Sequence, residues 1–115
     1  MDRKMKKLKQ DYSYGWEKLH CAVLCLSGSG EQRTRLISAL FALHTLVIRP
    51  EEKHLPDEIQ REFNEFWKEM TSVQAVEDEG TIQATVNSMD EMGIRRAVEK
   101  IIYFYDTIYR YIERY

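Results

Sequence analysis

The chain has 115 residues, of which 43% are hydrophobic and 31% are charged, and its formal net charge is −2. This composition excludes a disordered chain, and the length suffices for one core without disulfides or a metal. Only five glycines and two prolines are present, which is too little turn-forming material for a fold of many short strands. We therefore expect a single helical domain over residues 1–115.

The chain starts with a basic extension, residues 1–9, that carries five basic side chains and one acidic side chain, a net charge of +4. No apolar segment of a secretory signal follows it, so the sequence predicts a cytoplasmic protein. We interpret the extension as a solvated terminus, with nucleic-acid binding as the alternative. The side chains for that alternative are Arg3, Lys4, Lys6, Lys7 and Lys9, with Arg33, Arg35, Arg95 and Arg96 as additions.

Apolar residues recur at steps of four and three along most of the remaining chain, which is the spacing of one face of an α-helix. The pattern predicts helices over residues 12–27, 31–48, 56–71, 81–88 and 89–114. Glycines in 26–32 separate the first two helices, and prolines at 50 and 56 bound the loop before the third. The expected fold is an all-α, single-domain bundle of four main helices plus one short helix.

The width of each apolar arc predicts how far its helix is covered. The third helix has a stripe of roughly 100° and should lie on the outside, whereas the second is apolar over roughly 220°. The last helix is apolar over roughly half its circumference, which exceeds what one-sided packing needs. Either the chain itself or a second protein must cover the surplus. The interface candidates are Trp67, Ile102, Tyr103, Phe104, Tyr109 and Tyr111.

Five of the seven tyrosines lie in the last fifteen residues, IIYFYDTIYRYIERY. A helical projection places Tyr105 and Tyr115 inside the apolar arc, Tyr109 and Tyr111 on its two rims, and Tyr103 on the polar face. A tyrosine at the edge of a core buries its ring and keeps its hydroxyl in water, which suits the rim positions.

The segment RPEEKH, residues 49–54, places an arginine five positions before a histidine. It resembles the R-x4-H ribonuclease motif of HEPN-domain proteins, which are also small helical bundles. The resemblance covers six residues and implies Arg49 and His54 as catalytic residues, in a dimer that brings two copies of the motif together. In that family the motif opens a helix, whereas here Pro50 follows the arginine and both residues fall in a predicted loop.

The candidate metal ligands are Cys21, Cys25 and His44, because zinc prefers thiolates and imidazoles. The set lacks the clustered ligand pairs of a structural zinc site, so the sequence favours no metal and no cofactor. The cysteines lie four apart on one helix, where disulfide geometry is poor, which favours a reducing compartment. His44 lies within the apolar arc of the second helix, and we expect a buried, neutral histidine whose protonation lowers stability.

These patterns favour a non-enzymatic protein that acts through protein–protein interaction, by self-association or as an adaptor or accessory subunit. Enzymatic activity is left open, since no nucleotide-binding or nucleophile motif occurs. Two alternatives remain, a nucleic-acid-associated accessory protein and a HEPN-like ribonuclease using Arg49 and His54. No membrane partner is expected, because the longest apolar stretch, 36–48, is too short to span a bilayer.

Overall fold

A computed structural model describes residues 12–49, 51–77 and 79–112 of the chain. Within them lie α2 (Ser13–Leu26), α3 (Gln32–Leu43), the 3-10 turn η1 (His44–Leu46), α4 (Asp57–Met70), α5 (Gly80–Asn87) and α6 (Glu91–Ile112), and no strand. The predicted all-α bundle of four long helices and one short helix is confirmed. The basic extension 1–9, Pro50 and Tyr115 lie outside the described residues.

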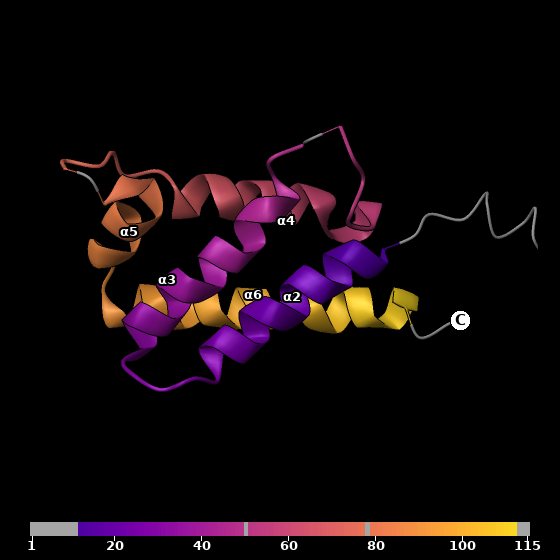
Figure 1. Cartoon of the computed structure of the whole chain (residues 1–115), viewed down its shortest axis with the longest axis horizontal. Coiled ribbons are helices and arrows are strands. Elements are labelled where there is room, and N and C mark those ends of the chain that lie inside the picture. The colour runs from indigo at the N-terminus through magenta and orange to yellow at the C-terminus, as the bar shows by residue number, and fades with distance from the viewer. Residues whose placement is uncertain (1–11, 50, 78, 113–115) are drawn as a thin grey trace, which may run out of the picture.

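Two pairs of helices form the bundle (Figure 1). α4 and α6 run antiparallel to each other, and the hairpin of α2 and α3 crosses over them, with α5 closing one end. The core fills the space between the pairs, and each long helix contributes fully covered side chains. Leu19, Leu40, Ile59 and Ile101 are all completely buried.

The second predicted helix ends five residues early. α3 stops at Leu43, and His44–Leu46 continue as a tighter 3-10 turn. His44 projects on the same flank of the apolar arc as Phe41 and Ile48, and these two side chains are 55% and 57% exposed. The described helices thus leave this flank uncovered, so His44 is exposed, and its ring stacks on Trp67 with the ring centroids 5.9 Å apart. The expectation of a buried core histidine at this position is wrong.

Two arginines of α3 hold the ends of neighbouring helices. Arg35 Nη1 donates to the carbonyl of Leu26 at 2.9 Å, where α2 ends. Arg33 Nη1 donates to the carbonyl of Val86 in the last turn of α5 and to that of Met89 just beyond it. The last carbonyls of a helix lack internal donors and carry partial negative charge, so a guanidinium stabilises them. In the described fold these two side chains thus tie helices together, although the sequence suggested them for a nucleic-acid surface.

The loop between η1 and α4 packs directly on α2 at Gly15. A Cβ atom at this position would lie 2.1 Å from the carbonyl oxygen of His54, well inside van der Waals contact. Glycine disfavours a helix interior, so the close approach of the loop explains its presence in α2. The following residues, Leu55 and Pro56, are buried and lead into α4. Gly15 therefore sets how closely the loop approaches α2 at His54.

Replacing Gly15 with alanine is expected to destabilise the protein by about 1–3 kcal/mol, because the added methyl group must displace the loop. This loss should appear although alanine favours a helix by about 1 kcal/mol over glycine. Urea unfolding followed by circular dichroism measures the change. Glu17→Ala, at an exposed position of the same helix, should stay within about 0.5 kcal/mol of the wild type. Wild-type stability of Gly15→Ala would show that the loop does not need this contact.

Candidate functional site

Aromatic rings line the seam between α2 and α6. Trp16 stacks on His20 with ring centroids 4.9 Å apart and on Tyr105 with centroids 6.2 Å apart. The Nδ1 atom of His20 lies 3.2 Å from the hydroxyl oxygen of Tyr105, and the Tyr105 ring continues to that of Tyr109 at 6.5 Å. Each ring is held by the next, so these side chains are ordered within the single chain.

Three large apolar side chains are exposed beside these rings. Leu24 of α2 is 57% exposed, and Ile102 and Tyr109 of α6 are 47% and 41% exposed. Ile102 and Tyr109 lie seven residues apart and so share one side of α6. Leu24 lies one turn beyond His20, which places it toward Ile102 because α2 and α6 run in opposite directions. We call this the α2–α6 surface; it consists of His20, Leu24, Ile102, Tyr105 and Tyr109.

Two other predicted interface residues, Phe104 of α6 and Trp67 of α4, pack within the chain. Phe104 is completely buried, with its ring edge-on to Phe63 at 5.5 Å and to Phe66 at 5.6 Å. Its assignment to an interaction surface is wrong, because α4 of the same chain covers it. Trp67 is half-buried and stacks on Phe63, with ring centroids 6.2 Å apart.

Two tyrosines of α6 close the seam toward α4 through hydrogen bonds. The Tyr103 hydroxyl donates to Glu62 Oε1 at 3.0 Å, and the Tyr111 hydroxyl donates to Glu58 Oε1 at 2.5 Å. Lys100 Nζ donates to the second oxygen of Glu62 at 3.1 Å. From Lys100 to Tyr111, this flank of α6 is therefore closed by polar contacts within the chain.

The exposure of the α6 tyrosines agrees in part with the helical projection. Tyr105 and Tyr111 are half-buried, and Tyr103 and Tyr109 are exposed. The polar-face placement of Tyr103 agrees with its exposure, while its hydrogen bond to Glu62 could not be read from one helix alone.

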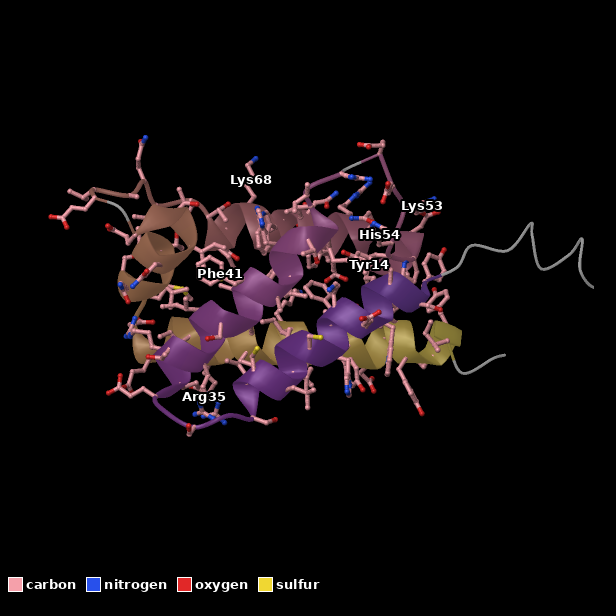
Figure 2. The ribbon with its side chains drawn as sticks, in the orientation of Figure 1. Tyr14, Arg35, Phe41, Lys53, His54 and Lys68 are labelled. Atoms are coloured by element: carbon pink, nitrogen blue, oxygen red, sulfur yellow. The ribbon has the colours of Figure 1, made fainter. Side chains whose placement is uncertain are left out.

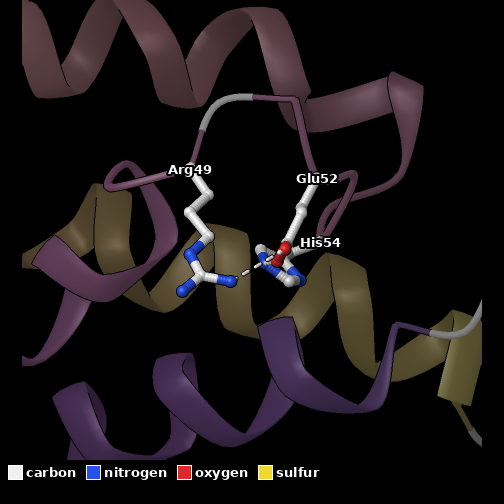
Figure 3. A network of polar contacts seen from close by, with 3 residues as sticks. All are labelled: Arg49, Glu52 and His54. Carbon is white, nitrogen blue, oxygen red and sulfur yellow. Dashed lines mark hydrogen bonds and ion pairs between the residues drawn. The ribbon is translucent and has the colours of Figure 1, made fainter.

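A polar network occupies the loop between η1 and α4 (Figure 3). Glu52 lies between the two motif residues: Arg49 Nη1 is 3.4 Å from Oε2, and His54 Nε2 is 3.1 Å from Oε1. The side chain of Arg49 is 70% exposed and that of His54 is 18% exposed. Both residues lie in the predicted loop, and α4 begins only at Asp57. The network offers an imidazole oriented by a carboxylate, with a guanidinium at the surface.

The loop network is supported from α2. The rings of Tyr14 and His54 lie 4.6 Å apart at an angle of 47°, and Figure 2 shows the two side chains close together where the loop meets α2. Lys18 Nζ lies 5.3 Å from the centre of the Tyr14 ring on its own helix. Together with the Gly15 contact, these interactions fix His54 more firmly than Arg49.

The candidate metal ligands do not form a site. In the part of the chain that the structure describes, no group of three or more His, Cys, Asp or Glu side chains could hold a metal ion. Cys21 and Cys25 are half-buried free thiols on α2, and His44 stacks on Trp67 at the end of α3.

Comparison of the chain with protein-family models, curated proteins and solved structures finds no match. Among the described helices, none combines the length and the apolar character needed to cross a membrane. The described structure contains two candidate sites, the α2–α6 surface and the Arg49–Glu52–His54 network.

The Glu62 contacts predict a pH dependence of stability. The hydrogen bond from Lys100, followed by that from Tyr103, lowers the pKa of Glu62 below its ordinary value of 4.5. A lowered pKa in the folded state stabilises the protein above the unfolded value, and this contribution disappears as the pH falls through the folded pKa. Glu62→Gln should therefore lower the melting temperature near neutral pH. Below about pH 5, the melting temperature of the variant should decrease less steeply with falling pH than that of the wild type.

The matched control is Glu65→Gln, which removes the same charge from an exposed position of α4 and leaves these hydrogen bonds in place. Thermal unfolding of both variants and the wild type at a series of pH values measures the effect. Equal pH profiles for Glu62→Gln and the wild type would contradict the role of this carboxylate.

Proposed function

We propose that this protein is a non-enzymatic interaction protein that self-associates through the α2–α6 surface. The observation that carries the proposal is the joint exposure of Leu24, Ile102 and Tyr109 beside rings that the chain already orders. Aromatic and aliphatic anchors of this kind dominate binding energy at protein interfaces. Ordered rings also reduce the conformational entropy lost on association.

The charges beside Ile102 favour a second copy of the chain as the partner. Arg95 and Asp106 lie eleven residues apart on α6, so three helical turns bring them to the same side within roughly 20°. In an antiparallel pair of α6 helices in which Arg95 of one copy faces Asp106 of the other, the two-fold axis passes between residues 100 and 101. Each Ile102 then lies within half a turn of the axis, opposite Glu99 of the other copy, and Arg95 and Asp106 match in charge.

The internal partner of Arg95 does not prevent this contact. Arg95 Nε lies 3.5 Å from Glu99, and the two side chains are 72% and 66% exposed. Such an exposed pair contributes little energy, roughly 0–1 kcal/mol, and leaves other guanidinium donors available.

Light scattering should give a mass near that of two 13.7-kDa chains, decreasing on dilution. Ile102→Asp should shift the protein to monomer, because it places a charge in the centre of the contact. Val76→Asp removes an 88% exposed apolar side chain from the loop between α4 and α5 and should leave the mass unchanged. A wild type that stays monomeric at every concentration would end the proposal.

A charge swap tests the arrangement of the two copies. Asp106→Arg alone should weaken association, because Arg95 of the other copy then meets a like charge. Adding Arg95→Asp to the same chain should restore it. A double variant as weak as the single one would contradict the antiparallel pairing while leaving the surface itself in place.

The loop network favours a second candidate function, RNA cleavage of the kind that the HEPN resemblance implies. The supporting observation is that Glu52 links Arg49 and His54 in one network. In this candidate His54 transfers protons and Arg49 binds the phosphate.

Incubation of the protein with labelled single-stranded RNA tests this candidate. Cleavage should be lost in both His54→Ala and Arg49→Ala, and it should persist in Lys53→Ala, an exposed neighbour in the same loop. Intact RNA with the wild type, or cleavage unchanged in His54→Ala, would remove the candidate without affecting the self-association proposal.

A further inference from the structure

A second surface of the molecule lies away from the α2–α6 surface. Residues of α4, α5 and α6 line an open groove of about 760 Å³. Its floor is apolar and includes Phe66 and Met70 of α4, Val73 of the following loop, Met89 and Ala97. Three of these side chains, Phe66, Met70 and Ala97, belong to the buried core, so the groove reaches the core of the domain.

The groove exists because α4 and α6 are joined tightly at one end only. The bonds from Tyr111 to Glu58 and from Tyr103 to Glu62 close the seam toward the end of α6. Toward the start of α6, the residues that face α4 are small, Gly93 and Ala97, and both line the groove. The larger side chains that α6 contributes here, Arg96 and Lys100, line the groove and leave the space beside the last turn of α4 open.

The walls of the groove carry opposite charges. α4 contributes Glu65, Glu69 and Lys68, and the Lys68 side chain is directed away from the bundle (Figure 2), while α6 contributes Arg96. Within the part of the chain that the structure describes, Glu65, Glu69 and Arg96 have no ion-pair partner, whereas Lys100 and Glu62 at the closed end bond each other. The open end thus presents an acidic wall, an apolar floor and a basic wall.

We propose that this groove binds an amphipathic helix of a partner protein that is basic along one edge and acidic along the other. Its apolar stripe would pack on Phe66, Met70 and Met89, and the flexible methionines suit such a contact. Its basic edge would face Glu65 and Glu69, and its acidic edge would face Arg96. The proposal is independent of self-association, because it uses the opposite flank of α6.

The probe is a fluorescent helical peptide of about four turns with leucines along one side, lysines on one edge and glutamates on the other. Fluorescence anisotropy should show binding to the wild type. A peptide with the same leucines but glutamates on both edges should bind weaker by on the order of tenfold, because it meets the acidic wall with like charge.

Matched protein variants locate the binding site. Glu65→Lys combined with Glu69→Lys should invert the preference between the two peptides, and these exposed positions leave the core intact. Ile102→Asp, on the α2–α6 surface, should leave peptide binding unchanged. Loss of binding in Ile102→Asp alone would place the peptide on that other surface and overturn the proposal.

Chemical-shift mapping gives an independent readout on the wild type. The amides of Val73, Gly93 and Ala97 should shift on addition of the lysine-edged peptide. Shifts confined to other parts of the chain, or no binding of either peptide, would overturn the proposal. A change of the oligomeric mass in the Glu65→Lys, Glu69→Lys variant would assign the groove to a second copy and overturn it as well.

Discussion

The wide apolar arc of α6 is the constraint on which the rest of the structure depends. A half-circle of apolar side chains cannot be covered by one neighbouring helix, and each large side chain left in water forgoes about 1.5–3 kcal/mol. α2 and α4 therefore pack on α6 from different sides, and Ile101 and Ile108 between them are completely buried. The hairpin of α2 and α3 crosses the bundle because α2 has to reach this position.

The two flanks of α6 end in different chemistry, and this difference separates the two proposed binding surfaces. Toward α4, carboxylates of Glu58 and Glu62 accept hydrogen bonds from tyrosines and a lysine and complete the seam. Toward α2, the seam ends in stacked rings and aliphatic side chains. There the buried indole N–H of Trp16 has no acceptor among the described residues. Of the apolar surplus expected of α6, Ile102 and Tyr109 thus remain exposed on the α2 side, whereas the exposed Tyr103 is hydrogen-bonded to Glu62 on the α4 side.

The close contact at Gly15 connects the packing of α2 to the second candidate site, the Arg49–Glu52–His54 network. Only a residue without a side chain lets the backbone of His54 approach α2 so closely, and this approach carries Glu52 and Arg49 into their network. The loop is therefore part of the packed structure, with Leu55 and Pro56 buried at its end. The placement of His54 depends on a contact between residues about forty positions apart in the chain, which the motif itself does not reveal.

The sequence by itself determined the helical class, the number of helices and most of their ends, because apolar spacing and the Gly and Pro positions act within one or two turns. It also identified Ile102 and Tyr109 as surplus apolar surface. Only the tertiary structure decided that α4 covers Phe104, that the flank of α3 with His44 stays uncovered, and that His20 and Leu24 join the α2–α6 surface. These outcomes depend on which helices become neighbours, and a periodic pattern along one helix carries no information about the helix that will pack against it.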